Sequence, residues 1–275
     1  MSDYIKKIKY FLGNYYRGLI GIFHNYFDKL EKIDKNIEHF SIGNSINGKE
    51  INCYKIGNGK NNLLIFSAIH GNEVGTAKLS HKILNWMWNN KTDFNNLTLY
   101  VIPVLNPDGY LKAVQNPNYF NRGRVGRFNS NNVDLNRNFP SSNFSQYDEW
   151  GMGKDFKQKQ KVFCGEFGAS EPEVENLVNF IKDKNIKNII ALHNVGQDVI
   201  ISNDKNKQVN QWTQIYNKQN FKTRFDLGYS GGAMDWAQEN NLNYMAVEGT
   251  SRWGSDWKKQ KLAIIQVLKE INNQK

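Results

Sequence analysis

Two histidines and one glutamate in this 275-residue chain have the residue types and positions of a metal centre. His70 and Glu73 lie three residues apart in the turn sequence His-Gly-Asn-Glu, and His193 follows an apolar run far along the chain. Two imidazoles and a carboxylate are a ligand set of catalytic zinc ions, which keep a fourth position for water. His193 alone would be interpreted as a hydrogen-bonded core residue, so its value as a ligand depends on where the chain places it.

Four apolar runs each stop at a polar residue. The runs LLIFSAI, LTLYVIPVL, IKNIIAL and NYMAV end at His70, Asn106, His193 and Glu248. Open α/β sheets bind ligands beyond the carboxyl ends of their strands. We therefore expect two histidines and a carboxylate to meet at one edge of a sheet.

The remaining pattern predicts the elements that position these residues. Residues 51–56 alternate as a strand does, and the Gly/Asn-rich segment 57–62 predicts a turn, so we expect a hairpin at a sheet edge. The sequence 106–109, Asn-Pro-Asp-Gly, predicts a turn that opens a loop of about thirty residues. Further strands are expected at 63–69, 97–105, 186–192, 198–202 and 244–247, and helices at 73–88 and 172–182, the second with a capping box from Ser170 to Glu173.

Alternating strands and helices predict an α/β fold, with helices around a mostly parallel sheet that has antiparallel pairs near its edge. The hydrophobic content of 39% and the length favour one domain. The net charge of +10 is spread along the chain without a basic, aromatic track, so we expect no nucleic-acid partner. Cys53 and Cys164 are expected to be free thiols.

The first 38 residues differ from the rest, and we interpret them as an N-terminal helical extension before a catalytic domain at 39–275. Polar residues interrupt the apolar stretch 10–27, which excludes a spanning helix there, and no signal peptide is evident. A cytoplasmic location is therefore expected. The extension can pack on the domain or lie on a membrane surface as an amphipathic helix, and we favour packing. The sequence gives no indication of oligomeric state.

Several ordered motifs together resemble the zinc carboxypeptidase family, over about residues 40–265. The resemblance is strongest to the bacterial branch of murein peptide amidases and gamma-D-glutamyl-diaminopimelate peptidases. It implies an α/β/α sandwich with a mixed sheet, one zinc ion, and removal of a residue that bears a free carboxylate. The motifs are HGNE at 70–73, NPDG at 106–109, VDLNRNFP at 133–140, SEPE at 170–173, ALH at 191–193 and VEG at 247–249.

The resemblance assigns catalytic roles by position. His70, Glu73 and His193 would hold the zinc ion, and Glu248 would take a proton from water and deliver it to the leaving amine. Arg127 matches the arginine that stabilises the developing oxyanion, with Arg122 and Arg124 as nearby competitors.

The resemblance also assigns substrate contacts. Asn136 and Arg137 match the pair that grips the terminal carboxylate of the substrate, and Asp134 matches the carboxylate that accepts a hydrogen bond from His70. As an alternative, Asp134 braces the loop. Digestive family members have a mobile tyrosine where this chain has Leu227. We expect Tyr229, two residues later, to substitute for it.

The substrate expected from these matches is a small peptide with a free carboxylate, in particular a cell-wall peptide that ends in a diamino acid. Met234 occupies the position that helps to set side-chain preference in the relatives, which argues against a preference for basic residues. Two alternatives remain open. One is an aspartoacylase-like zinc deacylase, against which the NPDG and SEPE motifs argue, and the other is a catalytically inactive peptide-binding module.

Overall fold

The central element of the computed structural model is an eight-stranded sheet with the strand order β1-β2-β4-β3-β7-β10-β8-β9. The structure describes residues 19, 23, 28–117, 125–152, 158–203, 205–225 and 229–274. The strands of this sheet are β1 (Glu38–Asn44), β2 (Glu50–Ile56), β3 (Asn61–Ser67), β4 (Leu97–Ile102), β7 (Asn188–Asn194), β8 (Asp198–Ile201), β9 (Lys222–Phe225) and β10 (Asn243–Gly249).

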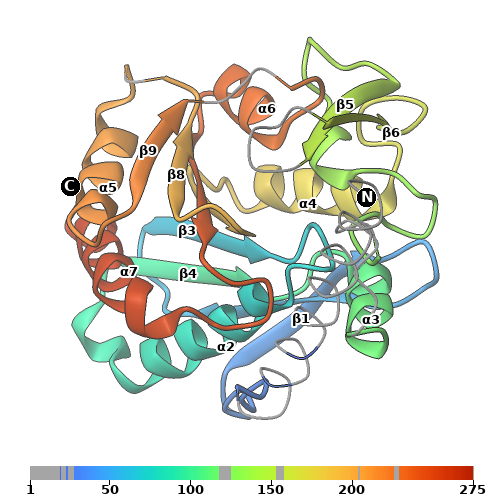
Figure 1. Ribbon diagram of the computed structural model, residues 1–275. Helices are drawn as coiled ribbons and strands as arrows, with labels where there is room; N and C mark the ends of the chain where they lie inside the picture. The colour runs from blue at the N-terminus through green and yellow to red at the C-terminus, as the bar shows by residue number, and fades with distance from the viewer. Residues whose placement is uncertain are drawn as a thin grey trace, which may run out of the picture.

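Helices cover both faces of the sheet, which confirms the predicted α/β/α sandwich (Figure 1). One face packs against α2 (Val74–Asn89), α5 (Lys207–Asn217) and α7 (Trp257–Asn272). The other face packs against α4 (Pro172–Asp183) and α6 (Ala233–Glu239). Strands covered on both faces are predominantly apolar, and every residue of β4 and β7 is buried here.

The four strands β4, β3, β7 and β10 run parallel to one another. Their carboxyl ends therefore lie at one edge of the sheet, as the sequence predicts. The outer pairs are partly antiparallel, since β2 is antiparallel to β4 and β8 is antiparallel to β10. The sheet is thus mixed and mostly parallel at its centre.

The predicted hairpin of strand 51–56 with the strand that follows it is wrong. β2 pairs with β1 on one side and with β4 on the other, and β3 lies beyond β4. β3 ends in a buried apolar run, as expected of a strand in the interior of a sheet that helices cover on both faces. β2 alternates between buried and partly exposed residues, which fits a position nearer the edge. The segment between them is a crossover, and the edge hairpin is formed by β1, a strand that we did not predict.

The long loop after β4 is more ordered than predicted. Asn106 begins the helix α3 (Pro107–Gln115), because its side-chain Oδ1 accepts a hydrogen bond of 2.8 Å from the backbone of Gly109. Beyond α3 the segment contains the short 3₁₀ helix η2 (Leu135–Arg137) and is followed by the hairpin of β5 (Tyr147–Met152) and β6 (Gln158–Phe163). The Asn-Pro-Asp-Gly sequence is therefore a helix start rather than a free turn.

The predicted capping box before α4 is also wrong. The residue that precedes the helix is Glu171, and no side chain caps it. Ser170 instead donates to the Glu171 carboxylate and accepts a hydrogen bond from Asn138. Its hydroxyl thus links α4 to the loop that carries the predicted substrate-binding residues.

Most of the predicted N-terminal helical extension lies outside the described residues. Residues 28–37 are non-helical and pack along α2. Asp28 accepts a hydrogen bond of 2.7 Å from the backbone of Ser255, and His81 on α2 contacts the carbonyl oxygen of Glu31 at 2.6 Å. Among the described helices, none has the length and the apolar character that crossing a bilayer requires. The cytoplasmic location stays a prediction.

Candidate metal centre and active site

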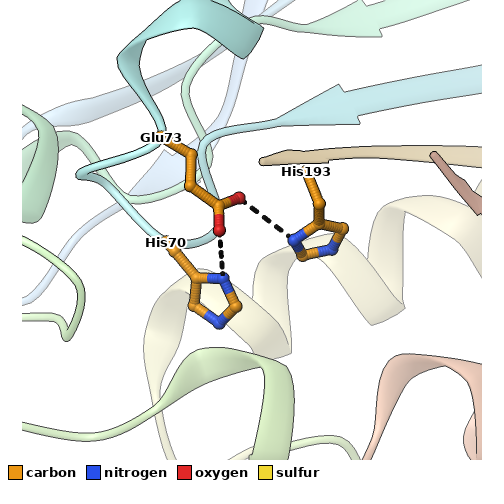
Figure 2. A group of neighbouring side chains, drawn as sticks. All are labelled: His70, Glu73 and His193. Carbon is orange, nitrogen blue, oxygen red and sulfur yellow. Dashed lines mark hydrogen bonds and ion pairs between the residues drawn. The ribbon is translucent and has the colours of Figure 1, made fainter. Parts of the chain in front are cut away.

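The side chains of His70, Glu73 and His193 converge at the carboxyl end of β3 and β7 (Figure 2). One carboxylate oxygen of Glu73 lies 3.1 Å from Nδ1 of His70, and the other lies 3.1 Å from Nδ1 of His193. The ligand atoms of the three residues all lie within 4.8 Å of one another, and all three residues are buried. This donor set fits a zinc ion, which binds imidazole nitrogen and carboxylate oxygen at about 2 Å.

The turn between β3 and α2 presents two of these side chains together because it is tightly packed. A Cβ atom on Gly71 would lie 2.2 Å from the backbone nitrogen of Tyr110 in α3, so only glycine fits between the two segments. Thr76 closes the turn, since its hydroxyl donates to the carbonyl of Glu73 and accepts from the backbone of Ala68. The start of α3 therefore fixes where His70 and Glu73 point.

The electrostatics of the cluster keep Glu73 in the anionic form that a metal ion would bind. Burial raises the pKa of Glu73, but the two histidines outweigh this effect and hold the pKa well below its usual range. For His193 the two effects have the opposite signs. Burial lowers its pKa, but the Glu73 carboxylate outweighs burial, so the pKa of His193 is raised. A metal ion bound here would replace protons as the partner of Glu73, which couples metal affinity to pH.

Asp134 links His70 of the candidate metal centre to Arg127. One oxygen of its carboxylate lies 3.1 Å from Nε2 of His70, and the other accepts hydrogen bonds of 3.2 and 2.8 Å from Nε and Nη2 of Arg127. All three residues are buried. Burial raises the pKa of Asp134, while Arg127 and His70 together hold it far below its usual value. The aspartate is therefore a fixed anion between an imidazole and a guanidinium.

Glu248 lies next to the cluster at the end of β10. It pairs in register with His193 on β7 and with Asp198 on β8, and its side chain is partly exposed. Burial and the neighbouring Glu73 raise the pKa of Glu248, and the nearby histidines and Arg224 offset part of that rise. A carboxylate with a raised pKa and access to substrate has the properties of a general base.

The residues predicted to grip a carboxylate lie around η2. Arg137 is buried, its Nε lies 3.3 Å from Asp148, and its guanidinium is 4.0 Å from the centre of the Tyr229 ring. Asn136 is partly exposed, and its carbonyl accepts a hydrogen bond from Arg137. Tyr229 therefore lies beside the predicted carboxylate-binding arginine, whereas Met234, on α6, packs into the core.

Sequence reasoning missed Asp148, which organises this end of the site. It pairs with Arg137 and accepts a hydrogen bond of 2.9 Å from the backbone of Ser230, next to Tyr229. It lies on β5, which has no apolar run that would have singled it out. The competing arginines at 122 and 124 and the leucine at 227 lie outside the described residues.

The fold and this cluster define an α/β/α sandwich with a candidate metal-donor set at the carboxyl ends of parallel strands. Residues 23–254 match the sequence model of the zinc carboxypeptidase family. The chain belongs to the zinc carboxypeptidase family.

Curated relatives agree with this membership. Human carboxypeptidase A6 is 27% identical over 259 residues, which cover 80% of this chain and 56% of the relative. Bovine carboxypeptidase O is 31% identical over 172 residues, 54% of this chain and 44% of the relative. A bacteriocin of Clostridium perfringens, BCN5, is 35% identical over 112 residues, 38% of this chain and 12% of the relative. The chain thus spans about half the length of the curated carboxypeptidases it matches.

Solved structures share the fold. Murein-tripeptide amidase MpaA from Escherichia coli O157 superimposes with a TM-score of 0.67 at 18% identity, over 90% of this chain and 97% of that one. An aspartoacylase family protein from Mesorhizobium loti superimposes with a TM-score of 0.55 at 15% identity, over 90% of this chain and 70% of that protein. The fold is therefore shared by a murein-tripeptide amidase and an aspartoacylase family protein.

Proposed function

We propose that this protein is a zinc carboxypeptidase that hydrolyses the amide bond before a residue with a free carboxylate. The observation that carries the proposal is the convergence of Glu73 with His70 and His193, beside Glu248. An inactive binding module would have no need to keep all three ligands and the base. His70, Glu73 and His193 would hold the zinc ion, which when bound polarises the scissile carbonyl and lowers the pKa of water.

Three further residues of the chain would have catalytic or orienting roles. Glu248 takes the proton of the attacking water and then delivers it to the nitrogen of the leaving amine, so one carboxylate acts as base and as acid. Arg127 stabilises the negative charge that develops on the carbonyl oxygen. Asp134 holds Arg127 through two hydrogen bonds and fixes the tautomer of His70.

Arg137 and Asn136 would bind the free carboxylate of the substrate. A guanidinium forms parallel, charge-assisted bonds to a carboxylate, and the buried Arg137 is oriented for this by Asp148 and Tyr229. Tyr229 would close over the bound carboxylate. These contacts make removal of a terminal residue, rather than cleavage within a long peptide, the favoured reaction.

The substrate we propose is a small murein peptide that ends in a diamino acid. The chain covers 97% of the murein-tripeptide amidase, whereas it covers 56% of human carboxypeptidase A6. Met234 is uncharged, so the position that helps to set side-chain preference in the relatives offers no acidic group to a basic substrate side chain. Comparison of gamma-D-glutamyl-diaminopimelate peptides with N-acyl amino acids separates this substrate class from that of an aspartoacylase-like deacylase.

The variant Glu248→Gln tests the mechanism. It keeps the shape of the side chain and removes its basicity, so kcat should fall by about 10²–10⁴-fold. Zinc content, measured by atomic absorption, should stay at one ion per chain. Hydrolysis at the wild-type rate by a fully zinc-loaded variant would contradict the proposed role of Glu248.

A further inference from the structure

Asp198 and Arg224 form an ion pair next to the candidate active site. Their closest oxygen and nitrogen atoms, Oδ2 and Nη2, lie 2.8 Å apart. Asp198 is the first residue of β8 and is buried, whereas the Arg224 side chain on β9 is 38% exposed. The catalytic roles proposed above use neither residue.

Sheet register places this pair on the same face as Glu248. Residues directly opposite in neighbouring strands point to the same face, as do alternate residues along one strand. Glu248 is opposite Asp198, and Ile200 is opposite Arg224. Ile200 packs with the core beneath α6, which includes Met234. All five side chains therefore lie on the α6 side of the sheet.

The distances around Gly196 show that the ion pair lies near the backbone end of the Glu248 side chain. A Cβ atom built on Gly196 would lie 2.7 Å from Oδ2 of Asp198, 3.1 Å from Cβ of Glu248 and 3.3 Å from Nη2 of Arg224. The absence of a side chain at Gly196 thus lets the ion pair lie beside the proposed base. Glu248, Ile200 and Arg224 are each partly exposed, so a substrate can reach this face.

Arg224 also has a hydrogen-bond donor that no described residue uses. Its Nε is buried and has no hydrogen-bond partner among the described residues, while Nη2 is engaged by Asp198. A buried N–H without a partner costs free energy that an incoming acceptor recovers. A guanidinium whose Nη2 is held by an aspartate, on a side chain that is 38% exposed, is arranged to receive a carboxylate at its exposed part.

We propose that Asp198 and Arg224 are the specificity-determining residues for the substrate's terminal side chain, and that they bind a side chain whose end bears both an amino and a carboxylate group. Arg224 takes the carboxylate and Asp198 takes the ammonium. Ile200 and Met234 contact the intervening methylene groups. This inference rests on the proposed peptidase function and extends it from the shared main-chain carboxylate to the side chain.

The pair fits a zwitterionic end better than a single charge. A purely acidic side chain would meet the Asp198 carboxylate, and a purely basic one would meet the Arg224 guanidinium, so each gains one attraction and one repulsion. A diamino dicarboxylic acid gains two attractions. A leucine side chain gains neither and leaves the Nε of Arg224 without an acceptor.

Three peptides of the form L-Ala-γ-D-Glu-X test the proposal, with meso-diaminopimelate, L-lysine or L-leucine as X. For the zinc-loaded wild type, kcat/KM should be at least tenfold higher for diaminopimelate than for lysine. Arg224→Gln should bring this ratio close to one. Asp198→Asn should instead lower kcat/KM for lysine relative to leucine, because the lysine ammonium loses its attraction to Asp198. Lys187→Gln removes an exposed charge just before β7, at the end of the strands away from the candidate active site, and should leave both ratios unchanged.

The ratios distinguish recognition from a structural fault, which would lower kcat/KM for all three peptides alike. Thermal unfolding and zinc content of each variant show whether it is folded. An unchanged diaminopimelate-to-lysine ratio in folded Arg224→Gln, or no such preference in the wild type, would overturn the specificity proposal while the peptidase function stands. A zinc-loaded wild type that cleaves none of the peptides would overturn both.

Discussion

Nε2 of His70 and Oδ1 of Asp134 lie 3.1 Å apart, and the second oxygen of the same aspartate holds Arg127. One buried carboxylate therefore orients a proposed zinc ligand and the proposed oxyanion-stabilising arginine. Ligation and transition-state stabilisation are linked through a single side chain, and a change at Asp134 should affect both.

Asp134→Asn should weaken zinc binding by about 10–100-fold, the usual cost of losing the carboxylate behind a ligand histidine. The amide cannot accept the His70 proton and bind Arg127 in the way the carboxylate does. Competition with a chromogenic chelator measures the affinity. Asp183→Asn, at the exposed end of α4, is the matched control. Equal affinities for the two variants would show that Asp134 only braces its loop.

Arg137→Gln should raise KM about 10–100-fold for peptides with a free terminal carboxylate, since hydrogen bonds to charged groups contribute about 1.5–3 kcal/mol. The same peptides with an amidated terminus should be poor substrates for wild type and variant alike. Steady-state kinetics on both peptide sets is the measurement. A variant that loses activity equally on free and amidated peptides would assign Arg137 a structural role instead.

Gly231→Ala should destabilise the fold and disturb carboxylate binding. Gly231 has a φ of +63°, and a Cβ atom there would lie 2.1 Å from the carbonyl oxygen of Arg137. Gly48 has a φ of +75° with no atom within 4 Å of such a Cβ, so Gly48→Ala isolates the backbone cost, about 1–3 kcal/mol. Chemical denaturation should show a larger loss for Gly231→Ala, and only this variant should raise KM. Equal losses would mean that the contact with Arg137 relaxes freely.

Lys78→Met should stabilise the protein at neutral pH. Lys78 on α2 is buried, and burial lowers its pKa to about 8 although Asp28 opposes the shift. Between pH 8 and the ordinary value of 10.5, the unfolded chain keeps a proton that the folded chain has lost, so wild-type stability should rise with pH. Below pH 8 the buried charge costs about 2–3 kcal/mol, which the methionine avoids.

Urea unfolding at several pH values measures this effect. The rise from pH 8 to 10.5 should disappear in Lys78→Met and persist in Lys82→Met, one turn further along α2. Parallel pH profiles for wild type and Lys78→Met would contradict the assignment to Lys78.

The sandwich and the convergence of the metal cluster could be predicted because they depend on local patterns. Buried parallel strands are apolar runs, and a polar residue where such a run ends lies at the edge where ligands bind. His70, His193 and Glu248 all follow this rule. The order of the strands was less accessible, since nothing within β2 indicates that β4 separates it from β3.

Residues that act through tertiary contacts left no signal in the sequence. Asp148 lies on a hairpin strand without an apolar run, and its value comes from Arg137 and Ser230, which are distant in the chain. Asp198 and Arg224 meet because of the register of β8 with its two neighbours. Ser170 matched a capping box and serves a different helix contact, because Asn138 competes for its hydroxyl.

The proposed zinc ligands are separated in the order of synthesis. Glu73 leaves the ribosome 120 residues before His193, and β7, which carries His193, is also the strand that covers one edge of β3. A nascent chain that stops short of β7 therefore has an uncovered apolar strand and two ligands of three. Such an edge is a template for aggregation. The segment that covers this edge of β3 is consequently the one that supplies the third proposed ligand, and products truncated before β7 should aggregate rather than load zinc.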